Sequence, residues 1–248
     1  MNTLLISFII PSLAGIMTTI GFLPTYISKK HQEMVIAFSL SFSAGIMITI
    51  SFASLIPESI ELLKYQEKIS NQVLAISFIL GVFFSNIIDH ILEKKEKDTK
   101  LYQLGIFSLI TLILHNIPEG ITTFLTTTSN LKLGISLSLA IALHNIPEGI
   151  AIAIPIYYAT NNRKKAFLYT AISGFSELLG AILAFLFIKK LSFLLLAILL
   201  SGTAGIMIDI SIRELIPSAL DYTNLKKCML GILLGSIIML ICIFIFKI

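Results

Sequence analysis

The sequence predicts an all-α membrane protein with eight transmembrane helices, and three observations lead to this fold class. The 248 residues are 56% hydrophobic and only 13% charged, and their mean hydropathy is +0.94. Soluble domains carry about 25% charged residues, so a soluble enzyme does not fit this composition. The apolar residues also gather in stretches of about 20 residues or more, the length of helix that crosses a bilayer.

Eight apolar spans follow one another with short connections between them. The first span lacks the basic leading region of a secretory signal peptide, so we interpret it as a retained helix. The spans leave no room for a separate soluble domain, and residues 1–248 are expected to form a single transmembrane domain. We place the helices near residues 3–27, 34–56, 72–92, 101–125, 131–157, 165–188, 191–217 and 227–246.

The basic residues predict the orientation, because loops rich in Lys and Arg stay on the cytoplasmic side of a membrane. The connections after odd-numbered spans carry most of them, as in EKKEKDTK at 93–100 and RKK at 163–165. Both termini are therefore expected to be extracytoplasmic, in the cell inner (cytoplasmic) membrane. The basic residues form no continuous face, which argues against a nucleic-acid partner, and Cys228 and Cys242 are too few for a thiolate zinc site.

Two internal repeats relate spans of opposite direction. HNIPEGI occurs at 115–121 and again at 144–150, and GIMITISFASLIP at 45–57 matches GIMIDISIRELIP at 205–217. Each repeat pairs an odd-numbered span with an even-numbered one, so the paired helices run antiparallel. Inverted repeats of this kind are typical of secondary transporters, where the substrate site lies at their junction. The predicted arrangement is three, two and three helices (3+2+3).

Ionisable side chains inside the spans are the candidate functional residues. Glu119, Glu148 and Glu177 alone would cost about 8–10 kcal/mol at mid-bilayer, and a bound cation would offset that cost. In each HNIPEG motif the His and Glu are four residues apart and share one helix face, with the Asn beside them. The prolines are expected to bend both helices. The candidate metal ligands are His115, Asn116, Glu119, His144, Asn145, Glu148 and Glu177.

This set of nitrogen and oxygen ligands suits Zn²⁺ and Fe²⁺, and also Mn²⁺ or Co²⁺, better than Ca²⁺ or Cu⁺. Two facing carboxylates could also bridge a pair of metal ions. An alternative is that the two polar clusters hydrogen-bond to each other and only fix helix packing. Glu177 has its own alternative, a structural hydrogen bond to a neighbouring helix, and Met47 is by itself a typical core residue.

Other charged residues receive structural interpretations. Asp209 and Arg213 are four residues apart, which predicts an ion pair inside the membrane. Glu214 then needs its own partner or a place at a helix end. Three residues at loop edges are expected to be solvated, namely His31, Asp89 and His90.

The chain resembles the ZIP family of divalent metal transporters, and within it the bacterial ZupT-like branch. The resemblance rests on HNIPEGITTF, LAIALHNIPEGIAIAIPIY, SGFSELLGA and AGIMIDISIRELIP, which follow one another in the family's order. It implies an eight-helix fold with extracytoplasmic termini and import of metal into the cytoplasm. Zn²⁺ is the usual substrate of the family, with Fe²⁺, Mn²⁺, Co²⁺ or Cd²⁺ often accepted.

The resemblance also implies roles for individual residues. The His, Asn and Glu of both motifs and Glu177 would be metal ligands, with Glu119 and Glu148 bridging two metals. Met47 lies where relatives place a soft ligand near the site. The sequence departs from the family at Ser54 and Arg213, where relatives often carry acids.

These observations predict uptake of a divalent metal ion by alternating access, with the metal bound as substrate and no resident cofactor. One alternative is a membrane-embedded metalloenzyme, although HExxH and GxSxG motifs are absent from the sequence. The other is a metal-selective channel. The expected partners are divalent metal ions and the lipid bilayer, and a homodimer is compatible with the sequence.

Overall fold

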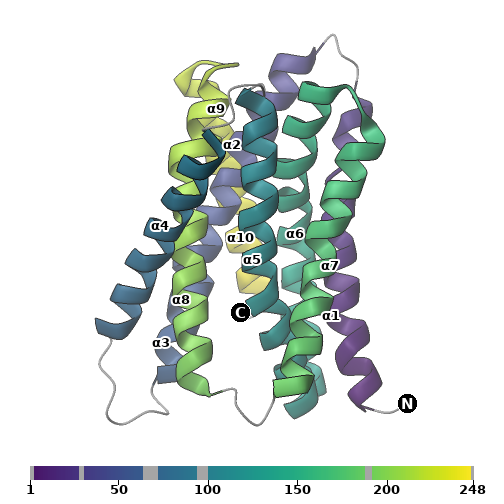
Figure 1. Ribbon diagram of the computed structural model, residues 1–248, viewed down its shortest axis with the longest axis vertical. Helices are drawn as coiled ribbons and strands as arrows, with labels where there is room; N and C mark the ends of the chain where they lie inside the picture. Colours follow the sequence, from purple (N-terminus) through teal and green to yellow (C-terminus); the bar gives the residue numbers. More distant parts are fainter. Residues whose placement is uncertain (1–2, 28–30, 64–71, 94–99, 188–191, 247–248) are drawn as a thin grey trace.

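The computed structural model describes residues 3–27, 31–63, 72–93, 100–187 and 192–246, and no strand occurs among them. Figure 1 shows a bundle of long helices. Eight of its helical segments are long and apolar enough to cross a membrane, which confirms the predicted fold class. The helices are α1 (Thr3–Ile20), α2 (Gln32–Ile50), α3 (Ile56–Leu63), α4 (Gln72–Glu93), α5 (Lys100–Ser129), α6 (Leu131–Thr160), α7 (Arg163–Phe187), α8 (Phe193–Asp209), α9 (Ile216–Leu220) and α10 (Leu225–Phe246).

Most predicted helix ends lie close to the observed ones. The predicted ends at 188 and 191, and most of the basic connection at 93–100, lie outside the described residues. The clear difference is in the second span, which continues to Leu63 instead of ending near residue 56. Both HNIPEG helices, α5 and α6, are helical throughout, and the bends expected at their prolines stay a prediction.

A π-helical turn explains why the second span continues. Ser51–Leu55 forms a π turn between α2 and α3, and the amide of Ile56 donates to the carbonyl of Ser51, five residues back. Pro57 follows and has no N–H to donate. The shifted hydrogen bond lets the chain pass this proline while remaining helical.

The second repeat has the same irregularity. Ile210–Leu215 is a π turn between α8 and α9, and the amide of Ile216 donates to the carbonyl of Ser211. Ser211 Oγ donates to the Met207 carbonyl over 2.7 Å, as Ser51 Oγ does to that of Met47. The repeat therefore extends from sequence to backbone geometry.

The eight spans pack as two groups. The first group is α1, α5, α6 and α7, which contact one another extensively, and the second is α2 with α10 and α4 with α8. The groups meet along α2 and α6 and along α5 and α8. This boundary is mainly apolar, with Met47, Ile152 and Leu200 in one buried cluster.

Glycines allow the closest helix approaches within the first group. A Cβ at Gly120 of α5 would collide with the carbonyl oxygen of Glu177 in α7, and one at Gly149 of α6 would collide with that of Thr18 in α1. Small residues at such crossings are typical of membrane helix packing. Because Gly120 and Gly149 belong to the HNIPEG repeats, α7 packs on α5 as α1 packs on α6. The inverted repeat thus includes α1 and α7.

One polar cluster lies between α4 and the π turn that follows α8. Arg213 lies 3.6 Å from Asp209, as predicted, and 3.7 Å from Asp89. Asn86 Nδ2 also donates to Asp209 Oδ1 over 3.2 Å. The prediction that Asp89 is solvated at a loop edge is wrong, because the packing of α4 on α8 brings it to Arg213 and leaves its side chain 18% exposed. His31 and His90 are exposed, as predicted.

Candidate metal centre

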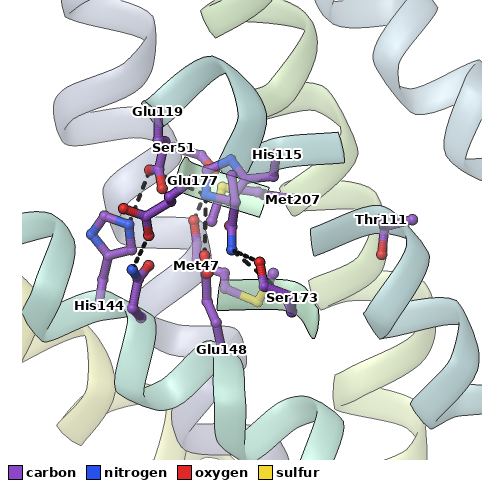
Figure 2. A network of polar contacts seen from close by, with 12 residues as sticks. Met47, Ser51, Thr111, His115, Glu119, His144, Glu148, Ser173, Glu177 and Met207 are labelled. Carbon is purple, nitrogen blue, oxygen red and sulfur yellow. Dashed lines mark hydrogen bonds and ion pairs between the residues drawn. The ribbon is translucent and has the colours of Figure 1, made fainter. Parts of the chain in front are cut away.

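The predicted ligands of α5, α6 and α7 converge in the interior of the first helix group. Figure 2 shows side chains of the three helices directed toward one another. The crossing at Gly120 brings α5 and α7 together, α6 packs against both of these helices, and the i, i+4 spacing places His and Glu on the same face. All seven predicted residues of these helices are buried, with exposed fractions of 3% or less.

The histidines and glutamates form a connected network. Glu119 Oε1 lies 3.2 Å from His115 Nε2 and 3.0 Å from His144 Nε2. His115 Nε2 is also 3.1 Å from Glu148 Oε1. Ligand atoms of His115, His144 and Glu148 all lie within 4.8 Å of one another. Donors that share a zinc ion lie about 2.0–2.2 Å from it and hence up to about 4.4 Å apart, so a small adjustment would let them bind one ion.

The asparagines are held by their amide nitrogens. Asn116 Nδ2 donates to the carbonyl of Ser173 in α7 over 3.1 Å. Asn145 Nδ2 donates to the carbonyl of Ala14 in α1 over 2.9 Å and to Glu177 Oε1. The two motifs therefore use equivalent bonds to equivalent helices. In both, the amide oxygen remains available to a ligand.

Each of the seven residues also keeps a buried polar atom with no hydrogen-bond partner among the described residues. Leaving such an atom unpaired costs about 1–3 kcal/mol, and native structures contain few of them. The atoms are His115 Nδ1, Asn116 Oδ1, Glu119 Oε2, His144 Nδ1, Asn145 Oδ1, Glu148 Oε2 and Glu177 Oε2. Nitrogen and oxygen donors of this kind are what a divalent transition metal requires.

Two methionines of the second helix group are drawn with this network in Figure 2. Met47 and Met207 occupy the same position in the two GIM repeats and are both buried, at 0% and 1% exposure. They belong to the apolar cluster between the helix groups. The sequence predicts a role for Met47 alone, although the repeat also identifies Met207. A ligand role for Met47 stays a prediction.

Cavities connect the network to one end of the molecule. A neck of about 20 Å³ is lined by Glu119, His144 and Glu58. Beyond it lie two overlapping wider cavities, which we call the vestibule, of about 640 and 1040 Å³. The vestibule opens where α3 and α5 end and α6 begins, the lower end of Figure 1. The neck and the vestibule share lining residues, among them Glu58, so they adjoin one another between the network and this end.

The opposite end has a smaller cavity made by the repeat-related residues. It measures about 170 Å³, and neither His115 nor Glu119 lines it. Its lining residues Arg213, Glu214, Pro217 and Ser218 occupy the repeat positions of Ala53, Ser54, Pro57 and Glu58 in the vestibule. We call this cavity the narrow mouth.

Glu58 is a site residue that the sequence analysis missed. The predicted end of the second span near residue 56 placed it in a connection, whereas the structure places it in α3 beside the neck. The repeat gives no signal for it. Pro57 and Pro217 lie at equivalent positions, and the predicted seventh span ends at its proline, one residue before the position equivalent to Glu58.

Comparison with known proteins gives consistent matches. A family profile described as ZIP Zinc transporter matches residues 92–243. The protein named Zinc transporter ZupT of Streptococcus mutans serotype c is 36% identical, with 97% of each chain covered. Proteins of the same name from Chlorobium luteolum, 39% identical with 92% of each chain covered, and from Campylobacter jejuni subsp. jejuni, 37% identical with 94% of each covered, are also similar. The recognition made from the HNIPEG motifs is confirmed, and the chain belongs to the ZIP zinc transporter family.

Proposed function

We propose that this multi-pass membrane protein takes up divalent transition metal ions into the cytoplasm, with Zn²⁺ as the main substrate and Fe²⁺, Mn²⁺ and Co²⁺ as further ones. The observation that carries the proposal is the set of seven buried nitrogen and oxygen atoms that have no hydrogen-bond partner within the described ranges, one from each predicted His, Asn and Glu ligand. If the two motifs only fixed helix packing, these atoms would be expected to bond one another. A metal ion satisfies them, and it also offsets the cost of the buried carboxylates.

The similar proteins support transport over catalysis. They are named zinc transporters, and membership of a transporter family means that the protein is not an enzyme. The repeat supports the same conclusion, since two equivalent mouths serve a passage between two sides and not a catalytic pocket. We expect the metal to be bound as substrate, with Glu119 and Glu148 able to bridge a second ion, and no resident cofactor.

Alternating access follows from the two helix groups. The seven predicted ligands all belong to α5, α6 and α7 in the first group, while the second group contributes Met47. Because the boundary between the groups is apolar, the first group can shift against the second without breaking many polar contacts. One contact that must yield is the hydrogen bond from Ser43 Oγ in α2 to the Pro147 carbonyl in α6, 2.7 Å long.

We place the protein in the lipid bilayer of the inner membrane with both termini extracytoplasmic. In this orientation the vestibule faces outward, and the narrow mouth faces the cytoplasm. The conformation in Figure 1 is then the outward-facing one, which receives the ion. A homodimer stays a prediction.

Uptake of ⁶⁵Zn²⁺ into proteoliposomes tests the proposal. We expect saturable uptake by the wild type and loss of at least about a hundredfold when Glu119 and Glu148 are both replaced by Ala, because two charged ligands are removed. Glu33→Ala, which removes an exposed acid at the start of α2, is the matched control and should be unaffected. Equal uptake by the double variant and the wild type would refute the proposed site. Counterflow of unlabelled zinc distinguishes a carrier from a channel, since only the carrier shows it.

A further inference from the structure

Glu58 is a partly buried carboxylate that is not among the ligands of the proposed centre. It lies in the first turn of α3, directly after the π turn and Pro57. Its side chain lines the neck together with Glu119 and His144, and it lines both parts of the vestibule. Glu58 therefore lies at the junction through which an ion must pass between the vestibule and the centre.

The neck is sized for a single small ion. Its volume of about 20 Å³ is close to the minimum of about 10–15 Å³ that holds one water molecule. A divalent ion that enters this space gives up part of its hydration shell, and the wall of the neck offers other oxygen donors in its place. Apart from Glu58, Glu119 and His144, that wall offers the hydroxyl groups of Ser54 and Thr122.

The residues of the neck also carry polar atoms that can bind a ligand. Glu119 Oε2 and His144 Nδ1 are buried and have no hydrogen-bond partner in the described part of the chain, and both residues line the neck. Glu58 therefore lines the same neck as two residues with atoms that can bind the same ion. Glu61, three residues further along α3, lines the vestibule but is not part of the neck.

The repeat indicates that the carboxylate is specific to this end. The position equivalent to Glu58 in the second repeat is Ser218, which lines the narrow mouth. The backbone requires no acid here, because Pro57 and Pro217 are preceded by the same π turn with either residue. A structural role common to both repeats therefore does not explain Glu58.

We propose that Glu58 is a relay ligand, whose carboxylate takes a divalent transition metal ion from the vestibule and passes it through the neck to Glu119 and His144. The inference rests on the proposed function and adds a step to it. The ion exchanges water for one Glu58 oxygen, and then exchanges that oxygen for the donors of the centre. Glu58 thus accelerates loading and contributes little to the affinity of the loaded centre.

The test compares Glu58→Gln with Glu61→Gln in proteoliposomes, using Zn²⁺ as the probe. Glu58→Gln keeps the shape of the side chain and removes its charge. We expect kcat/KM for uptake to fall about tenfold, the lower range of what a charged cleft contributes to capture of an ion, while kcat at saturating Zn²⁺ changes less than about twofold. Glu58→Asp should restore most of the loss, and Glu61→Gln should change kcat/KM less than about threefold, as a more remote charge screened by water.

Equilibrium binding separates the relay from other roles. Glu58→Gln in detergent should bind Zn²⁺ with wild-type affinity and unfold at the wild-type temperature. Unchanged kcat/KM in Glu58→Gln, equal losses in Glu58→Gln and Glu61→Gln, or loss of equilibrium binding in Glu58→Gln would each overturn the relay. Failure of the wild type to take up Zn²⁺ would instead overturn the proposed function, and the relay with it.

Discussion

The two mouths of the passage have related backbones and different sizes. Both are built after a π turn and a proline, at Pro57 in the vestibule and at Pro217 in the narrow mouth. The vestibule continues through the neck to Glu119, whereas the narrow mouth contains the Arg213 side chain, 3.6 and 3.7 Å from two acids. One repeated architecture therefore forms two mouths of different size within the same molecule, a wide one that adjoins the neck at Glu119 and a narrow one that Glu119 does not line. Alternating access requires such a difference, since exchanging the two sizes opens the other side.

Accessibility of single cysteines should show the largest difference between the mouths. Ser136 lines the vestibule and Ser218 the narrow mouth, and replacing Ser with Cys changes one atom in each. With Cys228 and Cys242 first replaced by Ser, we expect Ser136→Cys to react at least about tenfold faster than Ser218→Cys with a charged thiol reagent in detergent, because reactivity follows exposure. Similar rates without metal would show that the two mouths do not differ in solution.

Removing Arg213 should weaken the closed mouth. Arg213→Ala removes the two ion pairs that Arg213 makes with Asp89 of α4 and with Asp209 at the end of α8. Because Arg213 is 45% exposed, we expect a loss of about 1 kcal/mol, which corresponds to about fivefold faster labelling of Ser218→Cys. Arg213→Lys keeps the charge and serves as the control. An unchanged labelling rate in Arg213→Ala would mean that these ion pairs do not hold the mouth closed.

The ion pair between Lys100 and Asp221 should have the smallest effect. Lys100 Nζ lies 2.6 Å from Asp221 Oδ2 beside the narrow mouth, but the two side chains are 72% and 48% exposed. Such pairs contribute about 0–1 kcal/mol, and salt screens them. Lys100→Gln should therefore change zinc uptake less than about threefold. A loss comparable to that of the Glu119 and Glu148 double variant would show that closure depends on this surface contact.

The local part of the site could be predicted from the sequence. The spacing of His115 and Glu119 predicts one helix face, and their atoms lie 3.2 Å apart. The contacts of His144 with Glu119 and of His115 with Glu148 join different helices. They depend on the packing of α5 against α6, which the sequence does not specify.

The remaining features depend on interactions that hydropathy does not reveal. A π turn shifts hydrogen bonds without changing composition, so the sequence placed Glu58 outside the second span. Asp89 is predicted to be solvated because it lies at a loop edge, and its partner Arg213 is remote in the sequence. Glu58 lines the vestibule and Asp89 lines the narrow mouth. The two repeats differ in sequence at these mouths, so one repeat does not predict the residues of the other there.

Calorimetric titration of Zn²⁺ into the purified protein at neutral pH measures whether the buried donors hold the ion. We expect saturable binding by the wild type and no detectable binding when Glu119 and Glu148 are both replaced by Ala, with the variant still folded. Absence of zinc binding by the wild type, or equal binding by the double variant, would contradict the claim that these buried donors hold the transported ion.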